Sequence, residues 1–526
     1  MLDGRSHFFL SINLLQIAGF LVMAGFGFLG LPHFLIGAFL YLSGSAATFK
    51  IADKERLQSL AFQTIVLLLI NLVWYSSAKL ISFGDVSLFI YIILASNLVL
   101  LAWQFRRQSE NKSFTPLENA QQLAEERISP TRARGLMTYV SSLTGFNLPL
   151  LKPAVFFLLA VALSVLFTAH QKEAVYFFLL NAVGLAVFFS IINLGLSGTN
   201  RIVALVKLAV VLGVFSAATA VWQLYSSSFK FLYYPFVVER DQLILEKWEE
   251  VSRVVGVWQH PSYLGIYLAI LIPLSAFLIF YGSSRLLVRI FWAGSLVFMT
   301  SVLLLTNTRS SALAGFLGMA LMFFLANLFP FRFSIDVKKL AVLGTLAALS
   351  LVLYQFVFVS EIYTKPQAWR VDASATIWGR FLRADSMSTE SLVQRSKLYE
   401  LAWQTYLTRP FFGVGAKNFQ YEVEKTFGTG TDGHNLVLQT AAEMGTVGIF
   451  SIFWLYGAIL LALFRSLKNI QNPDQKYLLA ALFGTVFLIL FDSMFNNPLY
   501  SLRIAAVFWI IVALQYSMFL DNRFNA

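Results

Sequence analysis

One histidine combines a residue type and a position that suit general-base chemistry. His434 follows the turn-forming run GTGTDG and directly precedes a long apolar segment, so we expect it at the N-terminal tip of a helix. Backbone N–H groups at a helix N-terminus carry partial positive charge, which favours the neutral imidazole that accepts a proton near pH 7. The alternative interpretation is an interfacial histidine that only caps the helix.

A polar stripe follows His434 into the apolar segment. Asn435, Gln439 and Glu443 are spaced four residues apart, so they share one face of the expected helix. A carboxylate at membrane depth is costly unless it is paired or hydrated. This face is therefore expected to line a polar cavity or to pack against another polar helix, with Asn435 and Glu443 as candidate substrate contacts.

Two arginines are candidates for binding an anion. Arg309 lies between two apolar segments, and Ser310 and Ser311 follow it as helix-capping residues. A cation beside a helix N-terminus is unfavourable unless an anion joins both, which a phosphate would do; the alternative is an arginine that snorkels to lipid headgroups. Arg395 lies in a long polar segment, where its planar fork suits diphosphate oxygens or a surface ion pair.

The run RVVGVWQHPSYLGIYL contains a second histidine and a further arginine. His260 precedes Pro261, which is well placed to begin a helix, and Arg253 lies close by in the sequence. Both residues are candidate substrate contacts, and His260 competes with His434 for the role of base. The polar stripe beneath His434 favours His434.

These residues are set in a strongly apolar chain. Of its 526 residues, 58% are hydrophobic and 13% are charged, about half the charged fraction of roughly 25% that is usual in soluble proteins. Segments long enough to cross a bilayer as helices recur throughout. We predict an all-α integral membrane protein with about fourteen transmembrane helices, at residues 8–29, 32–49, 59–78, 86–105, 153–169, 175–194, 202–222, 262–281, 289–306, 311–329, 340–360, 435–463, 477–495 and 504–520.

The distribution of Lys and Arg predicts the orientation. With both termini cytoplasmic, the basic loops that follow alternate spans all lie inside, in agreement with the positive-inside rule. Two long loops, at 223–260 and 361–433, then lie outside, the second before the twelfth span. We divide the chain into N-terminal helices with a cytoplasmic loop (1–135), central helices that include the periplasmic loop 223–260 (136–360), a large periplasmic loop (361–433) and C-terminal helices (434–526).

Several function classes are not supported by the sequence. The net charge of +12 is scattered over many loops, so no nucleic-acid partner is expected. The chain has no cysteine, no phosphate-binding glycine loop and no cluster of metal-ligand motifs, so we expect neither a cofactor nor a metal. No cleavable signal peptide is expected at the N-terminus.

Four blocks together resemble the O-antigen ligase and Wzy-type polymerase superfamily of bacterial envelope enzymes. They are RVVGVWQHPSYLGIYL, NTRSSALAG, RSKLYELAWQTYLTRPFFGVGAKNF, and GHN with EMGTVG, in this order over roughly 250–500. The resemblance implies a GT-C-like membrane glycosyltransferase in the bacterial inner membrane, with its active site on the periplasmic face. It also implies a polyprenyl-diphosphate-linked glycan as donor, His434 as general base, and Arg309 and Arg395 as ligands of the donor diphosphate.

The resemblance leaves the acceptor open. Lipid A-core ligases are typically shorter, whereas this chain has additional N-terminal spans and a polar loop at 106–135. The expected partners are the lipid-linked donor, a glycan or glycolipid acceptor and membrane lipids, and a chain-length regulator is a further candidate. The preferred function is a ligase that moves a glycan onto an acceptor hydroxyl, and the alternative is a polymerase that joins lipid-linked repeat units.

Two other classes remain as alternatives. A lipid-glycan flippase would carry ionisable residues at mid-membrane depth in several spans and have short outer loops, whereas here charges gather in two long outer loops. A peptidoglycan polymerase of the shape, elongation and division type shares the polytopic plan, but its motifs find no strong match here.

Overall fold

A computed structural model describes the chain with gaps. The described residues are 4–26, 31–48, 53–73, 79–81, 84–113, 150–194, 199–225, 254–258, 260–328, 336–359, 387–428, 430–468, 470 and 472–524. The candidate Arg253 and most of the loop 223–260 lie outside this set.

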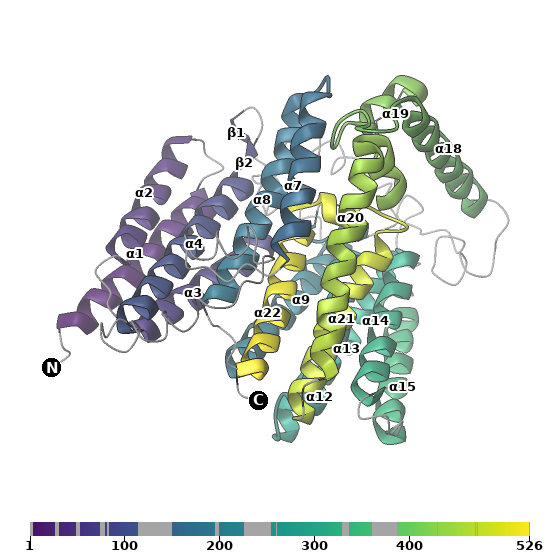
Figure 1. Ribbon diagram of the computed structural model, residues 1–526. Coiled ribbons are helices and arrows are strands. Elements are labelled where there is room, and N and C mark those ends of the chain that lie inside the picture. The colour runs from purple at the N-terminus through teal and green to yellow at the C-terminus, as the bar shows by residue number, and fades with distance from the viewer. Residues whose placement is uncertain are drawn as a thin grey trace, which may run out of the picture.

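Helices account for almost all of the described elements (Figure 1). In chain order the elements are α1 (Gly4–Phe26), α2 (Leu31–Ala47), α3 (Lys54–Val73), β1 (Lys79–Ile81), β2 (Gly84–Asp85), α4 (Val86–Ser113), α7 (Leu151–Leu166), α8 (Gln171–Asn193), α9 (Thr199–Tyr225), α12 (Pro261–Tyr281), α13 (Leu286–Leu305), α14 (Arg309–Leu328), α15 (Val337–Val352), the π-helix η6 (Leu353–Val359), α18 (Met387–Thr408), α19 (Phe419–Phe427), α20 (Leu436–Lys468), α21 (Pro473–Asp492), the 3-10 helix η9 (Pro498–Tyr500) and α22 (Leu502–Phe524).

The apolar helices confirm the predicted fold class. Within the described ranges, 10 helices are long and apolar enough to cross a membrane, and four shorter apolar helices lie at Phe8–Ala24, Leu31–Ala47, Leu151–Leu166 and Leu502–Met518. Each predicted span corresponds to one of these helices, in order. The chain is therefore an all-α multi-pass membrane protein. The antiparallel ribbon formed by β1 and β2 was not predicted.

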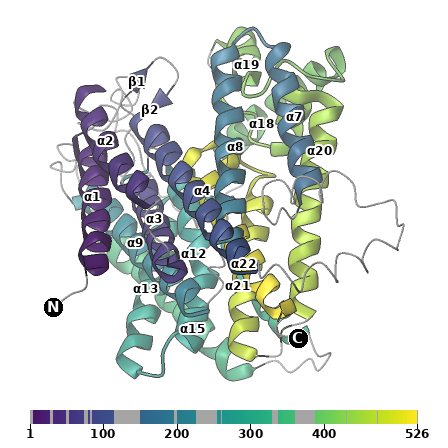
Figure 2. The same cartoon turned by 60° about the vertical axis from the view of Figure 1, so that its left-hand side comes forward.

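The helices form two neighbouring groups. Helices α1 to α4 lie together on one side in both ribbon views, and α4 packs on α8 of the larger group (Figures 1 and 2). In the larger group, α12 is almost entirely enclosed and contacts α13, α14 and α21. Helix α7 packs on α20, and α8 packs on α22. Helices α18 and α19 lie at one end of this group, beside the start of α20.

Two glycines allow α14 and α21 to touch backbone to backbone. A Cβ added at Gly484 would lie 2.4 Å from the carbonyl oxygen of Gly318, so neither position tolerates a side chain without a shift of the helices. This close contact fixes the beginning of α14 beside the end of α21. Arg309 and Asp492, which lie at these two helix ends, are thereby placed in the same region.

Helix α20 is broken at Gly445. This residue has φ 62° and ψ −157°, a backbone conformation that is open essentially only to glycine. The turn between α18 and α19 supplies the backbone hydrogen bonds that the break removes: the amides of Val414 and Gly415 donate to the carbonyls of Ala442 and Glu443, and the amides of Thr446 and Val447 donate to those of Pro410 and Phe411. Protein groups thus satisfy the backbone donors and acceptors that the break leaves without helical partners.

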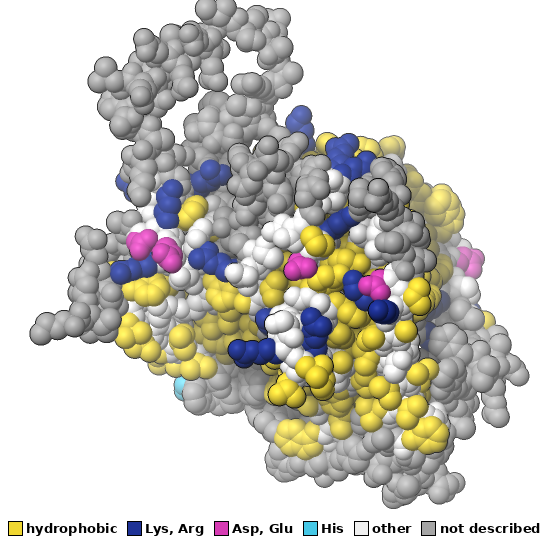
Figure 3. Space-filling model, turned by 90° about the horizontal axis from the view of Figure 1, so that it is seen from below, with side chains coloured by type: hydrophobic (Ala, Val, Ile, Leu, Met, Phe, Trp, Pro, Cys, Tyr) yellow, Lys and Arg dark blue, Asp and Glu magenta, His cyan; other side chains and the backbone are white. Residues whose placement is uncertain are grey.

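The face of the molecule opposite to α18 and α19 carries basic residues. Viewed from this side, Lys and Arg side chains are spread among apolar ones (Figure 3). The ends of α13, α15 and α20 that lie away from α18 and α19 contribute Arg285, Lys338, Lys339, Arg465 and Lys468.

Candidate active site

The start of α20 is bound firmly to the end of α21. The side-chain oxygen of Asn435 accepts a hydrogen bond from the amide of Leu438 (3.0 Å), and its Nδ2 donates to the carbonyl of Met494 (3.0 Å). The amide of Leu436 donates to the carbonyl of Ser493 (2.8 Å). These contacts satisfy N–H groups that a helix N-terminus leaves unpaired, and they make Asn435 the residue that caps α20. A contact of Asn435 with substrate stays a prediction.

His434 lies at the tip of α20, as predicted, in a strained conformation. It is half-buried and has φ 51°, in the left-handed region that side chains other than glycine seldom adopt. The hydroxyl of Tyr399 on α18 donates to its carbonyl at 3.4 Å. Such strain persists only where surrounding contacts determine the conformation, and it concentrates at functional sites.

The surroundings of His434 favour its neutral form. Burial lowers the pKa of this imidazole, and the nearby positive charge of Arg395 lowers it further, while Asp432 opposes them. The direction agrees with the expectation from the sequence, with burial as the first cause. A neutral imidazole with a free lone pair is the form that accepts a proton.

Removing the positive charge of Arg395 and removing the negative charge of Asp432 should move the pH profile of activity in opposite directions. A base acts when deprotonated, so activity falls as the pH drops through its pKa. In the native protein, we expect the midpoint of this acidic limb to lie at a pH below the usual pKa of histidine. Arg395→Gln removes a lowering effect and should move the limb to higher pH, whereas Asp432→Asn removes a raising effect and should move it to lower pH. The pH dependence of kcat/KM measures this shift, and an acidic limb that both variants leave in place would contradict it.

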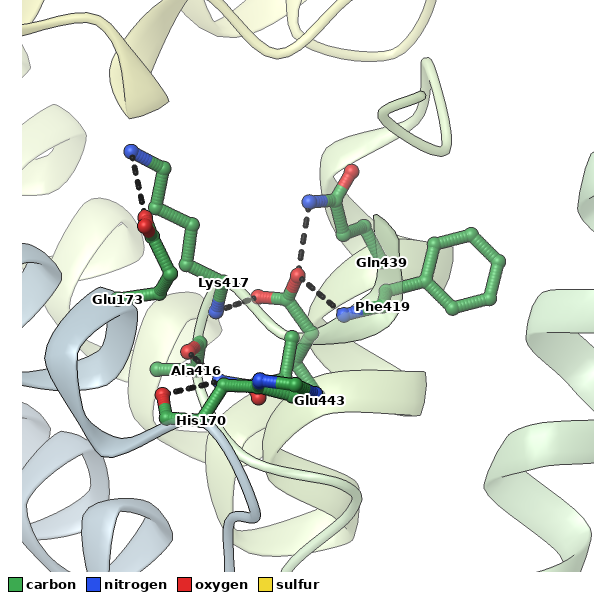
Figure 4. A network of polar contacts seen from close by, with 8 residues as sticks. His170, Glu173, Ala416, Lys417, Phe419, Gln439 and Glu443 are labelled. Atoms are coloured by element: carbon green, nitrogen blue, oxygen red, sulfur yellow. Dashed lines mark hydrogen bonds and ion pairs between the residues drawn. The ribbon is translucent and has the colours of Figure 1, made fainter. Parts of the chain in front are cut away.

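Glu443 is the centre of a buried hydrogen-bond network (Figure 4). Its carboxylate is fully enclosed. Oε2 accepts from the backbone amide of Lys417 (2.7 Å) and from the hydroxyl of Tyr500 (2.8 Å). Oε1 accepts from Gln439 Nε2 (2.9 Å) and from the amide of Phe419 (3.3 Å). The polar stripe therefore packs against polar groups of neighbouring segments.

This network reaches the turn that carries His434. Gln439 connects the two, because its Oε1 accepts from the amide of Gly433 (2.8 Å) and from Nδ2 of Asn497. Glu443 is therefore connected to the turn before His434 through Gln439, and its hydrogen bonds named above go to protein groups. A contact of Glu443 with substrate stays a prediction, and so does a role in positioning His434.

Polar contacts of the residues that follow Arg309 connect the start of α14 to the end of α21. Arg309 is half-buried and is the first residue of α14. Ser311 Oγ donates to the carboxylate of Asp492 (3.2 Å), and Asn496 Nδ2 donates to Ser310 Oγ (2.7 Å).

Arg395 approaches this region from α18. It is half-buried, and its charge acts on both His434 and Asp492. The beginnings of α14 and α20 therefore meet the end of α21 near Asp492, and Arg395 of α18 lies close enough for its charge to act there. Diphosphate binding by Arg309 and Arg395 stays a prediction.

His260 serves as a helix cap. It is exposed, and its Nδ1 accepts a hydrogen bond from the amide of Ser262 at 3.2 Å, so α12 begins at Pro261 as predicted. This hydrogen bond occupies the Nδ1 lone pair and favours His434 over His260 as the base. Within the described ranges, no three His, Cys, Asp or Glu side chains lie together as a metal site would require.

Two contributors to the site escaped the analysis of the sequence. Tyr500 and Asn497 belong to the short polar run NNPLYSLR between the last two spans, and both join the network around Glu443 and Gln439. A cluster of amides, a hydroxyl and an arginine between two apolar helices was the signal that could have identified them.

Comparison with known proteins gives a family match that covers part of this site. A family model described as O-antigen ligase matches residues 294–453, a range that contains Arg309, Arg395, His434 and Glu443. The teichuronic acid biosynthesis protein TuaE of Bacillus subtilis (strain 168) is 25% identical over 216 residues, which is 39% of this chain and 40% of that protein. The alignment thus spans less than half of the relative's length. These matches confirm the resemblance seen in the sequence: residues 294–453 are similar to the O-antigen ligase family.

Proposed function

We propose that this protein is a metal-independent inverting glycosyltransferase that transfers a polyprenyl-diphosphate-linked glycan to an acceptor hydroxyl. The main support for the proposal is the environment of His434. This residue is half-buried and strained, and its pKa is lowered by burial and by Arg395, within the range that the family model matches. A neutral base beside fixed cations is the arrangement that such a displacement needs.

The proposed reaction is a single displacement. His434 removes the proton from the acceptor hydroxyl, and the resulting oxygen attacks the anomeric carbon of the donor sugar. The bond between that carbon and the diphosphate oxygen breaks, and the lipid diphosphate leaves with its negative charge stabilised by Arg309 and Arg395. Attack opposite the leaving group inverts the anomeric centre.

The distribution of charge supports an active site on the outer face of the membrane. Basic residues mark the helix ends that lie away from His434, which is the pattern of a cytoplasmic face. The part of α20 that follows the break at Gly445 and ends at Lys468 is roughly 35 Å long at 1.5 Å per residue. Because a hydrocarbon layer is about 30 Å thick, this part can cross it alone, and we assign the His434 end, before the break, to the periplasmic side.

The choice between a ligase and a polymerase depends on the acceptor. The family description names a ligase, which favours transfer to a lipid or other glycan acceptor. The relative is named for teichuronic acid biosynthesis, which keeps a polymerase that joins lipid-linked repeats as the second candidate. Offering both acceptors to the purified protein distinguishes the two.

Removing either arginine should weaken the donor interaction. Arg309→Gln and Arg395→Gln each remove a charge-assisted contact, so we expect the KM for the lipid-linked donor to rise about 10- to 100-fold. Initial rates in proteoliposomes at varied donor concentration measure the effect. Arg409→Gln, an exposed position after the end of α18, is the matched control. A donor KM that neither variant changes would contradict the assignment of the diphosphate site.

A further inference from the structure

A cavity of about 140 Å³ lies next to the network around Glu443, and none of the proposed catalytic groups uses it. Its wall is formed by the segment before α12, the first turn of α12, α8 and the junction between η9 and α22. Most of its side chains are aromatic, and one is cationic: the lining residues are Tyr176, Trp258, Tyr263, Tyr500, Ser501, Leu502 and Arg503. Cavities with apolar and aromatic walls and a few placed polar groups are typical of ligand sites.

Arg503 is held in a defined orientation at this cavity. The residue is only 4% exposed. Its Nη1 donates to the carbonyl of Val257 at 2.9 Å, and its guanidinium carbon lies 4.6 Å from the centre of the Trp258 ring. Trp258 in turn stacks on Tyr267, with ring centres 4.4 Å apart. Because a guanidinium offers five N–H donors in a rigid plane, its orientation at the cavity wall is suited to binding a planar anion.

The cavity is coupled to the proposed catalytic site. Tyr500, which lines it, donates its hydroxyl to Glu443 at 2.8 Å. Glu443 in turn accepts from Gln439, whose Oε1 accepts from the amide of Gly433, directly before His434. An occupant of the cavity would therefore lie close to the turn that presents His434.

A second cation lies at the edge of the cavity. The Nζ atom of Lys417 is 4.2 Å from the centre of the Tyr176 ring and 3.5 Å from the carboxylate of Glu173. Its backbone amide is bound to Glu443. Lys417 is not itself a lining residue, and Glu173 offsets its charge, so the positive charge among the lining residues comes from Arg503.

We propose that this cavity binds an acidic sugar residue of the glycan substrate, with the sugar carboxylate on Arg503 and the sugar ring against the partly exposed Tyr176 and Tyr263. The inference deepens the proposed function and rests on it. Aromatic faces suit the apolar C–H face of a sugar ring, and the planar guanidinium matches a carboxylate. A diphosphate has no apolar face to use these rings, so it fits the region of Arg309 and Arg395 better than this cavity.

Direct binding of small sugars tests the proposal. Saturation-transfer NMR on the full-length protein in nanodiscs would compare D-glucuronate with D-glucuronamide, its neutral isostere, and with D-glucose. We expect glucuronate to bind at least about tenfold more tightly than the amide, because only the carboxylate engages Arg503. Inorganic diphosphate should not displace it. Equal binding of glucuronate and glucuronamide, or displacement by diphosphate, would refute an acidic-sugar site.

Variants locate the binding within the protein. Arg503→Gln should abolish the preference for glucuronate, whereas Arg309→Gln and Arg395→Gln should retain it. A preference that survives Arg503→Gln would refute the assignment, and the comparison of sugars on native protein remains decisive if that variant does not fold. His434→Ala should bind glucuronate normally, so failure of the proposed transferase chemistry and failure of this sugar site give different results.

Discussion

Replacing His434 with alanine is expected to lower glycan transfer by about 10²- to 10⁴-fold, the usual contribution of a general base, while leaving donor binding in place. The physical reason is that the acceptor hydroxyl then keeps its proton as its oxygen attacks, and no other neutral base occupies the tip of α20. Transfer is measured with lipid-linked donor in proteoliposomes, and donor binding by equilibrium titration on the same preparation.

The matched control is the other histidine considered as base. His260 caps α12 through its Nδ1, so His260→Ala should cost some stability of that helix start but retain transfer within about tenfold. Full activity of His434→Ala, or a larger loss in His260→Ala than in His434→Ala, would remove His434 from the role of base.

Replacing Glu443 with alanine should have the largest effect on stability. The carboxylate accepts four hydrogen bonds from fully enclosed surroundings, including the amides of Lys417 and Phe419. Each buried donor left without its acceptor costs about 1–3 kcal/mol, so the combined loss should be at least about 3 kcal/mol. Since the turn between α18 and α19 is tied to α20 at this point, transfer should fall together with stability.

Two further variants distinguish loss of the hydrogen bonds around Glu443 from loss of a negative charge. Glu443→Gln keeps an acceptor oxygen and should lie between the native protein and the alanine variant. Glu424→Ala removes a carboxylate from an exposed position on α19 and should change the melting temperature in detergent little. A Glu443→Ala protein that melts and transfers like the native one would show that the network does not position the site.

The fold was largely predictable because the hydropathy that marks a membrane-spanning helix is a property of that segment alone. Each span is a continuous apolar segment of sufficient length, so hydropathy identified every candidate membrane-spanning helix even without knowledge of its neighbours. Helices α18 and α19, which lie in the predicted loop 361–433 and are not apolar, were missed. The β1–β2 ribbon lacked such a signal, since it consists of five residues between two spans. The break in α20 was also missed, because Gly445 in an apolar segment equally predicts a close helix crossing, and its positive φ depends on a turn some thirty residues earlier.

The site was predictable to the extent that helix periodicity and helix ends define it. His434 at the tip of α20, and Gln439 and Glu443 on one face, follow from spacing alone. The partners of Glu443 do not, because Lys417 and Tyr500 come from distant segments and one of them contributes only its backbone. The same limit applies to Arg503, whose place beside Trp258 follows from the packing of α22 against the segment before α12.

The formation of a new glycosidic bond is the most direct test of the central claim. Purified protein in proteoliposomes would receive a lipid-linked donor of one anomeric configuration and a defined acceptor, and NMR would determine the configuration of the product. The account predicts an inverted linkage and one lipid diphosphate released for each bond formed. Movement of intact lipid-linked glycan across the bilayer with no new bond, or a product that retains the donor configuration, would contradict it.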